Sequence, residues 1–387
     1  DEARAFLQTF LLEYPVHPLR PQGLFLAGWT EYRCGRPGAA ARFFSTAATE
    51  APRQAGAEPG GGTDDRLVPA ARAIYWASRA QEDAGRRDEA ELGYLTLLRL
   101  YPLSYYAELA HARLGSATPL RLEGAAPATV EGTDRRLLWA QQALYLGWRQ
   151  EALAELAPLL AHPEGVDSGR DLLAAARLLR HLGREATARH LARIAVLHHA
   201  PELGARERER AWHLAFPTPF AGLVEAAAGR HGLSPWLLFG LVLRESGFRR
   251  CATSRAGAVG LMQLTGPAAA DAARDLGLPA PTRDRLCEAT YNLRLGTWHL
   301  RKLLSHYQGS LILALAAYNA GPGWVDRWLE RMPGWDLDAF VEEIPFEETR
   351  TYVRAVISAM RAYTWIYGET PGTQLGRLAL DHSRSGG

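Results

Sequence analysis

A turn signature that recurs along the first 210 or so residues constrains the fold of this chain most strongly. In it, a glycine is followed five positions later by an alanine, and apolar residues at helical spacing flank each copy. Glycine ends helices well because it adopts positive φ without a steric penalty, so each copy predicts a helical hairpin. The spacing between copies is unequal, which favours an irregular α-solenoid over a strict tetratricopeptide array. The copies are Gly35 with Ala40, Gly85 with Ala90, Gly147 with Ala152, and Gly183 with Ala188.

The rest of the chain also reads as helices, including residues 292–307 and 311–318. We find no run of alternating β-branched residues with hairpin turns, although short hairpin-like irregularities around residues 251–259 stay open. The sequence therefore predicts an all-α protein. Stretches rich in Pro and Gly at residues 51–65, 115–133 and 216–219 predict a flexible loop, a linker and a domain boundary. The expected segments are residues 1–116, 117–212, 213–370 and a flexible tail at 371–387.

Composition excludes several classes of function. A formal net charge of +2 indicates no nucleic-acid partner, and no segment approaches the ~18 consecutive apolar residues of a membrane span. The three cysteines are too few for a zinc site or a disulfide scaffold, but Cys251 and Cys287 either pair in an oxidising compartment or stay reduced. No dinucleotide or phosphate fingerprint occurs and the His pairs lack metal-ligand spacing, so we expect no cofactor and no metal.

Glu245 stands in the last turn of an apolar helix that the sequence delimits clearly. Ser234 is a candidate N-cap, Pro235 suits the first helical position, and Gly247 ends the helix. Burial and the negative end of the helix dipole both disfavour a carboxylate there, so we expect a raised pKa. A carboxyl group that keeps its proton near neutral pH is suited to act as a general acid. From this helix alone, a glutamate that merely pairs with a neighbouring arginine is an equal alternative.

Three further segments complete an ordered pattern with the Glu245-Ser246 pair. They are GAVGLMQ at residues 257–263, AAYNAGPG at residues 316–323, and IPFEETRTYV at residues 344–353. Together they resemble the signatures of the soluble lytic murein transglycosylases, the family-1 type with a goose-lysozyme-like catalytic domain. The resemblance covers roughly residues 216–368. Family members usually continue with Met-Pro after the first segment, where this sequence has LTGP at residues 264–267.

The resemblance implies a fold for both halves of the chain. A lysozyme-like α-helical catalytic domain is expected at residues 213–370. Residues 73–115 are similar to the ring-forming helical domain of the large soluble transglycosylases, which implies a partial ring-type solenoid domain at residues 1–116 and a helical linker domain at residues 117–212. A generic protein-binding solenoid is the alternative for this half.

The resemblance also implies an activity and a substrate. In the family, one glutamate protonates the β-1,4 glycosidic oxygen between N-acetylmuramic acid and N-acetylglucosamine. As a carboxylate it then deprotonates the muramyl C6 hydroxyl, which closes a 1,6-anhydro ring without consuming water. Most other glycosidases need a second carboxylate, and none lies between Glu245 and Asp271, although Asp326 or Glu348 can come from distant loops.

Site roles carried over from the family follow the same motifs. Glu245 is the expected catalytic residue. Ser246 is expected to bond the sugar or to orient Glu245, with a backbone bond at the helix end as an equal alternative, and Met262 has ordinary core packing as its alternative. Tyr318 is expected to contact Glu245 or the N-acetyl group. The expected substrate-binding residues are Ser246, Gly260, Met262, Gln263, Tyr318, Asn319, Glu348 and Tyr352.

The expected partners are peptidoglycan glycan strands and, through the solenoid, proteins of the cell-wall machinery. The family implies export to the periplasm. The chain starts at Asp1 without a leader, so either a signal peptide was removed or this is a fragment. Two rival functions stay open: a hydrolase of the same fold that uses water, and a solenoid scaffold with a non-catalytic, glycan-binding C-terminal domain.

Overall fold

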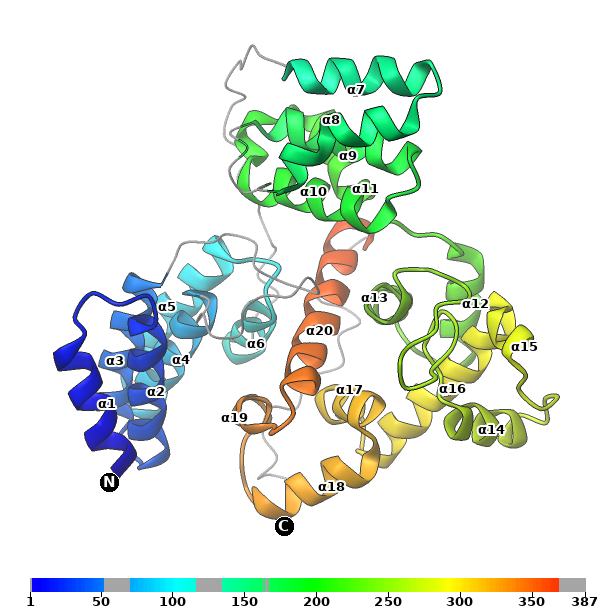
Figure 1. Cartoon of the computed structure of the whole chain (residues 1–387). Helices are drawn as coiled ribbons and strands as arrows, with labels where there is room; N and C mark the ends of the chain where they lie inside the picture. Colours follow the sequence, from blue (N-terminus) through cyan, green and yellow to red (C-terminus); the bar gives the residue numbers. More distant parts are fainter. Residues whose placement is uncertain are drawn as a thin grey trace. The chain divides into compact units, whose positions relative to one another are not determined.

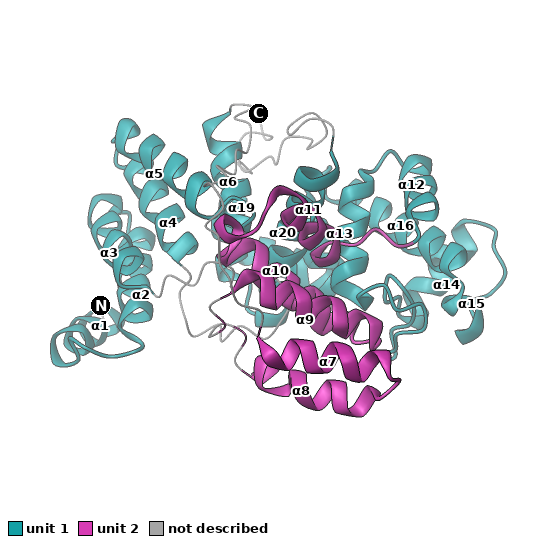
Figure 2. Ribbon diagram, turned by 90° about the horizontal axis from the view of Figure 1, so that it is seen from above, with its two compact units in different colours: residues 1–120, 220–387 teal, residues 121–219 magenta. Residues whose placement is uncertain are grey.

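The structure, a computed structural model, describes residues 2–51, 70–115, 134–161, 163, 166 and 168–368. The tail predicted at residues 371–387 and nearly all of the loop at 51–65 and the linker at 115–133 lie outside the described residues. Within the described ranges the regular structure is helical, with two isolated β-bridges near residue 259, and the all-α class is confirmed. The chain divides into two compact units, residues 1–120 with 220–387 (unit 1) and residues 121–219 (unit 2) (Figure 2). The domain boundaries predicted near residues 116 and 212 remain a prediction.

The N-terminal part of unit 1 is a row of helices that pack in sequential pairs (Figure 1). The predicted turns are present: Gly35 and Gly85 have φ of +69° and +78° and follow the first helix of a pair. Ala40 and Ala90 are buried where the second helix packs against the first. The helices are α1 (Glu2–Glu13), α2 (Arg20–Arg33), α3 (Pro37–Glu50), α4 (Ala70–Asp83), α5 (Arg87–Leu100) and α6 (Tyr105–Leu114).

Unit 2 repeats the same local design. Gly147 and Gly183 have φ of +80° and +75°, and Ala152 and Ala188 are fully buried in the hairpins that follow. All copies of the turn signature thus form helical hairpins, as predicted. The helices are α7 (Arg135–Tyr145), α8 (Arg149–Ala161), α9 (Gly169–His181), α10 (Glu185–His198), the 3₁₀ helix η2 (Ala200–Glu202) and α11 (Ala205–Ala215).

The C-terminal part of unit 1 is built around α20, the longest helix, which packs against α13 and α17 and also against α6 (Figure 1). This arrangement connects the motif-bearing helices to the N-terminal row. The helices are α12 (Ala221–Arg230), α13 (Pro235–Ser246), α14 (Gly266–Asp275), α15 (Arg283–Cys287), α16 (Ala289–His306), α17 (Leu311–Ala320), α18 (Pro322–Arg331), α19 (Leu337–Glu343) and α20 (Glu347–Tyr367).

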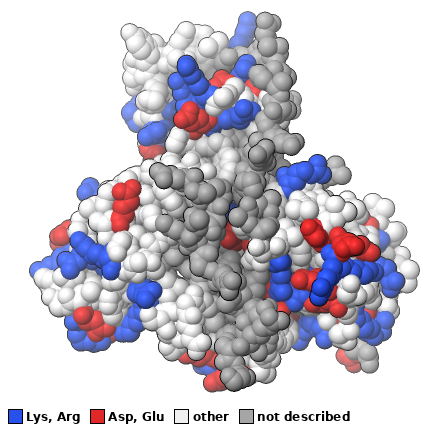
Figure 3. All heavy atoms as spheres, turned by 180° about the vertical axis from the view of Figure 1, so that it is seen from behind, with Lys and Arg blue, Asp and Glu red and all other residues white. Residues whose placement is uncertain are grey.

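Acidic and basic side chains are interspersed on the face drawn in Figure 3, in keeping with the small net charge. Among the described helices, none has the length and apolar character that a membrane crossing requires. The same residues contain no group of three or more His, Cys, Asp or Glu side chains placed to hold a metal ion.

Candidate active site

Glu245 is held at the end of α13, and this helix begins and ends as the sequence predicts. Ser234 Oγ accepts a hydrogen bond from a backbone N–H of the first turn at 3.2 Å, and Gly247 ends the helix with φ of +57°. The helix lies very close to α20 at a glycine, since a Cβ on Gly240 would stand only 2.9 Å from Met360 N. This close approach brings the C-terminal turn of α13 beside the first turns of α20.

The pKa of Glu245 is shifted in the direction predicted from the sequence. Burial raises it to about 7. A hydrogen bond from Tyr352 and the charge of Arg244 act in the opposite direction, and the charge of Glu348 raises the pKa further. Burial outweighs the stabilising partners because a carboxylate loses more hydration here than two neighbours restore. A large fraction of the carboxyl groups is therefore protonated at neutral pH, as a general acid requires.

Tyr352 is the direct partner of this carboxyl group. Its side chain is buried, and its Oη donates a hydrogen bond to Glu245 Oε1 at 2.5 Å. Burial and the charge of Glu245 raise the pKa of Tyr352 well above its usual value, so the phenol keeps its proton and remains a donor. Glu348 lies one turn earlier on the same helix, with its side chain exposed. The first turns of α20 thus supply one hydrogen-bond donor and one negative charge to the site.

Tyr318, near the C-terminal end of α17, is the second phenol of the site. Its Oη donates to the carbonyl of Met262 at 2.8 Å. Burial and the charge of Glu245 raise the pKa of Tyr318, so its phenol keeps its proton and remains a donor. The ring of His299 lies 5.3 Å from that of Tyr318, centroid to centroid, and burial lowers the His299 pKa, which favours the neutral imidazole.

The loop at residues 251–264 is organised by Asn292, a fully buried side chain on α16. Asn292 Oδ1 accepts a hydrogen bond from Met262 N at 2.8 Å. Its Nδ2 donates to the carbonyls of Val259 and Leu286, each at 3.0 Å. One amide therefore satisfies three buried backbone groups and fixes the position of the Met262 carbonyl to which Tyr318 bonds.

Gly260 is required at its position by this same packing. Its φ is +93°, and a Cβ there would lie 2.0 Å from Asn292 Nδ2 and 2.4 Å from Leu286 O. Neither the backbone conformation nor the space admits a side chain. The glycine permits the loop to approach α16, a structural reason for its presence that does not involve a ligand.

The predicted site residues divide into two groups. In the first group, Tyr352 bonds to Glu245 and the charge of Glu348 raises the Glu245 pKa, whereas the pKa of Tyr318 is itself raised by the charge of Glu245. The second group bonds to other protein atoms, so any contact of these residues with substrate remains a prediction. In that group, Ser246 Oγ donates to Val242 O at 3.2 Å, and Gln263 Nε2 donates to the carbonyls of Ala252 and Gly260 at 2.9 Å. Asn319 Oδ1 accepts a hydrogen bond from Thr349 Oγ1 at 2.6 Å. Gly260 packs on Asn292, and Met262 is fully buried. For Ser246 and Met262 these are the contacts of the alternative interpretations given above.

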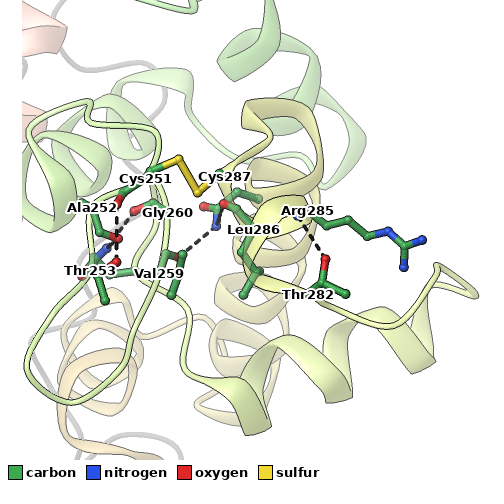
Figure 4. Close-up of a disulfide and its surroundings, with 11 residues drawn as sticks. Cys251, Ala252, Thr253, Val259, Gly260, Thr282, Arg285, Leu286 and Cys287 are labelled. Carbon is green, nitrogen blue, oxygen red and sulfur yellow. Dashed lines mark hydrogen bonds between the residues drawn. A yellow bond between two sulfur atoms is a disulfide. The ribbon is translucent and has the colours of Figure 1, made fainter.

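Cys251 and Cys287 form a disulfide, one of the two arrangements that the sequence left open (Figure 4). Their Cα atoms are 4.7 Å apart, within the usual range for such a bridge. The bridge joins the start of the loop to the last residue of α15, next to Leu286, whose carbonyl accepts from Asn292. The loop is therefore attached to the same place both covalently and by hydrogen bonds. Cys34 is exposed and free.

Sequence reasoning missed Asn292 and His299. A signal for Asn292 existed, because it lies three positions before Leu295 and four after Glu288, on the side of the helix that carries apolar residues. His299 had no comparable signal, since a single histidine in an amphipathic helix is common on protein surfaces.

Sequence comparison finds relatives for the C-terminal part of the chain. Residues 222–336 match the transglycosylase SLT domain family. A protein of Haemophilus influenzae assigned as a soluble lytic murein transglycosylase is 37% identical over 162 residues, which is 41% of this chain and 27% of that protein. The soluble lytic murein transglycosylase of Escherichia coli K12 is 31% identical over 158 residues, 40% of this chain and 24% of that protein. The matched segment spans about a quarter of these curated relatives.

Solved structures extend the similarity to nearly the whole chain. An inactive variant of the lytic transglycosylase Slt of Pseudomonas aeruginosa superposes with a TM-score of 0.67 and 26% identity, over 98% of this chain and 58% of that one. The 70-kDa soluble lytic transglycosylase of Escherichia coli gives 0.59 and 19% identity, over 98% and 62%, a likeness of fold alone. These neighbours confirm the predicted combination of a helical solenoid with a lysozyme-like domain. The chain carries a transglycosylase SLT domain, and in sequence and fold it is a relative of the soluble lytic murein transglycosylases.

Proposed function

We propose that this chain is a peptidoglycan lytic transglycosylase of the periplasm, which cleaves the β-1,4 bond between N-acetylmuramic acid and N-acetylglucosamine without water. One observation carries the proposal: a carboxyl group with a pKa of about 7, that of Glu245, lies among the motifs of an SLT domain. The chain matches only part of its curated relatives, so its activity and substrate are inferences from the site and the family.

The proposed reaction uses one carboxyl group twice. Protonated Glu245 gives its proton to the glycosidic oxygen as the bond to the muramyl C1 breaks, and the N-acetylglucosamine end leaves as an alcohol. The resulting carboxylate then takes the proton of the muramyl C6 hydroxyl while the C6 oxygen bonds to C1. The products are one alcohol and one 1,6-anhydromuramyl end, and Glu245 is protonated again.

The neighbours of Glu245 suit this alternation between acid and base. The Tyr352 hydroxyl donates to the carboxyl group and stabilises the carboxylate formed after the first proton transfer. Glu348, exposed one turn away, adds negative charge that favours positive charge building up at the anomeric carbon. Tyr318, held by the Met262 carbonyl, forms a wall of the site near the carboxyl group.

The relatives are consistent with a glutamate as the catalytic group and with the same substrate. The curated relatives are murein transglycosylases by name, and murein is peptidoglycan. The inactive Pseudomonas aeruginosa variant differs from its parent by one Glu-to-Gln replacement, which is the change that removes a transferable proton. Of the carboxylates considered as second partners, Asp326 accepts from Tyr307 and pairs with His306, whereas Glu348 acts on Glu245.

The test is product analysis with purified peptidoglycan. Mass spectrometry of the released muropeptides should show 1,6-anhydromuramic ends. Reducing ends would instead show a hydrolase, and loss of all release in Glu348→Gln would then identify Glu348 as its second carboxylate. No soluble product from a folded chain would indicate the glycan-binding scaffold, and binding to peptidoglycan in a sedimentation assay would show it directly.

The pH profile gives a first quantitative prediction. Because Glu245 must carry a proton to act as the acid, kcat/KM should fall as pH rises through the pKa of about 7. An initial-rate profile between pH 4.5 and 9 measures this limb. A descending limb near pH 4.5, the ordinary value for a glutamate, would show that burial does not govern the acid.

Tyr318→Phe gives a second prediction. The change removes one hydroxyl and its bond to the Met262 carbonyl, and leaves the ring packed against His299. Activity should drop at least ~10-fold, while the free energy of unfolding changes by about 1 kcal/mol, the value of a typical hydrogen bond. Activity assays with urea unfolding separate the two effects. A large loss of stability with unchanged specific activity would make Tyr318 a core residue only.

A further inference from the structure

The carboxylate of Glu342, near the end of α19, is buried where the N-terminal and C-terminal helices of unit 1 meet. Its Oε2 accepts hydrogen bonds from Arg72 on α4 and Arg354 on α20, each at 2.6 Å. Its Oε1 accepts from Tyr106 Oη on α6 at 2.7 Å and from Trp76 Nε1 on α4 at 3.1 Å. One carboxylate is thus bonded to α4, α6 and α20 at the same time.

Three more polar contacts connect α19 or α20 to α4 or α6. Asp338 on α19 accepts hydrogen bonds from Tyr75 Oη at 2.5 Å and from Arg113 Nη2 at 3.1 Å. Arg361 on α20 donates to Glu108 on α6, and both side chains are buried. We call the contacts of Glu342, Asp338 and Arg361 the α20 anchor.

The charge of Glu342 is permanent in this environment. Burial alone would raise its pKa, but Arg354 and Arg72, with the hydrogen bonds from Tyr106 and Trp76, lower it to about 2. The carboxylate therefore stays ionised over the whole pH range in which Glu245 titrates. Its bonds hold α20 in the same way whether or not Glu245 is protonated.

Opposite faces of α20 contact different partners. Tyr352 and Arg354 are two residues apart, which on an α-helix is a rotation of about 200°. Tyr352 bonds to Glu245, and Arg354 bonds to Glu342 on the other side of the helix. Arg361 follows Arg354 by two turns on the same side. Since a helix is stiff, fixing the arginines fixes the rotation and the axial position of Tyr352.

We propose that the α20 anchor positions the active-site face of α20, so that Glu342, Arg354 and Arg361, with their partners on α4 and α6, are positioning residues for Tyr352 and Glu348. The inference rests on the proposed function. It makes the N-terminal helices a part of the catalytic apparatus of unit 1, although none of their residues reaches the carboxyl group of Glu245.

A contribution to stability does not by itself explain why these buried contacts are polar. Buried ion pairs often contribute no more to stability than well-packed apolar residues of similar volume, because desolvation offsets their attraction. Hydrogen bonds to a charged group are directional, however, and four of them on one carboxylate admit one relative placement of the helices. An apolar contact of the same area would tolerate small slides and rotations of α20.

The experiment measures whether a change at the anchor reaches Glu245. Two variants alter it, Glu342→Gln and the milder Tyr106→Phe, which removes one hydroxyl. Tyr94→Phe is the matched control, because the Tyr94 hydroxyl is also held by a carboxylate, that of Glu82 at 2.8 Å on α4, away from α20. The pKa of Glu245 is read by NMR of ¹³C-carboxyl-labelled glutamate, with the resonance assigned by its loss in Glu245→Gln, and kcat and KM are read on peptidoglycan fragments.

If the anchor positions Tyr352, its variants should resemble Tyr352→Phe. The charges and donors that act on Glu245 are Arg244, Glu348 and Tyr352, with Tyr318 close by, so a weakened Tyr352 bond raises the pKa. We expect a rise of about 0.5 unit or more in Glu342→Gln, a smaller rise in Tyr106→Phe and none in Tyr94→Phe. The kcat should fall at least ~5-fold with KM changed less than ~2-fold. In a Tyr352→Phe background, the anchor variants should add no further pKa shift.

Three results would overturn the inference. The first is a folded Glu342→Gln protein with wild-type pKa and kcat, and the second is a shift that persists undiminished in the Tyr352→Phe background. If Glu342→Gln does not fold, Tyr106→Phe decides, and unchanged values there are the third. A wild-type chain that releases no product would defeat the proposed function alone, because the NMR titration reports the position of Tyr352 without any turnover.

Discussion

Glu245→Gln should lower the release of muropeptides by ~10²–10⁴-fold or more, because general acid–base catalysis contributes about that much and glutamine has no proton to transfer. The shape of the side chain and its contact with Tyr352 persist, so the fold should not change. Peptidoglycan turnover followed by mass spectrometry measures the loss. Glu225→Gln, the same change at an exposed position of α12, is the control and should keep full activity. Near-wild-type turnover in folded Glu245→Gln would remove Glu245 from the mechanism.

The same variant tests the electrostatics of the site through stability. The folded pKa of Glu245, about 7, lies above the ordinary 4.5, so its protonated form favours the folded state below pH 4.5. That contribution is lost as pH rises through 7, and amounts to at most about 3.5 kcal/mol at ~1.4 kcal/mol per pKa unit. Glu245→Gln should therefore be at least as stable as wild type at pH 8 in thermal melts. A markedly less stable variant at pH 8 would show that an arginine, such as Arg244, anchors the carboxylate as an ion pair.

Asn292→Leu should be the most damaging of the substitutions for stability. Leucine has a similar volume, but it leaves the Met262 N–H and the Leu286 carbonyl buried without their partner, while the Val259 carbonyl keeps only its bond from Leu264 N. Each unsatisfied buried group costs about 1–3 kcal/mol, so with two such groups the free energy of unfolding should fall by ~2 kcal/mol or more. Activity should also fall in the fraction that folds, since the Met262 carbonyl holds Tyr318.

Urea unfolding measures this loss. Thr290→Ala, on the exposed side of the same helix start, is the matched control and should change stability by less than about 0.5 kcal/mol. Equal urea midpoints for Asn292→Leu and Thr290→Ala would mean that water or a shifted backbone replaces the hydrogen bonds of Asn292. The loop at residues 251–264 would then not depend on this amide.

The parts of the structure that the sequence predicted are those that local chemistry decides. A hairpin turn needs only a glycine with positive φ and a small residue where the next helix packs. Gly85 and Ala90 therefore predict their hairpin from local sequence alone. The helix of Glu245 is equally local, because Ser234 caps it and Gly247 ends it. Burial of its last turn followed from its apolar sequence, and so did the direction of its pKa shift.

The parts that escaped prediction are pairings between distant residues. Glu342 bonds to Arg72 and Tyr106, and nothing in the spacing of arginines and glutamates along the chain distinguishes these partners from solvated ones. The motif makes Gly260 and Met262 expected substrate-binding residues, with core packing as the alternative for Met262, and their contacts with α16 can be recognised only once the loop is placed against that helix. A sequence motif contains residues that stabilise the fold together with residues that contact the substrate, and the motif alone does not distinguish the two.

The polar character of the α20 anchor has a consequence for biosynthesis. Arg72 and Glu342 are 270 residues apart, and the whole of unit 2 is encoded between them. At about 5–20 residues per second, Glu342 leaves the ribosome roughly a quarter of a minute to a minute after Arg72. During that interval the docking face of α4 and α6 has no partner. Water can hydrate the arginine and tyrosine groups until Glu342 is synthesised. A nascent chain with this face is therefore less prone to aggregate than one that exposes an apolar surface.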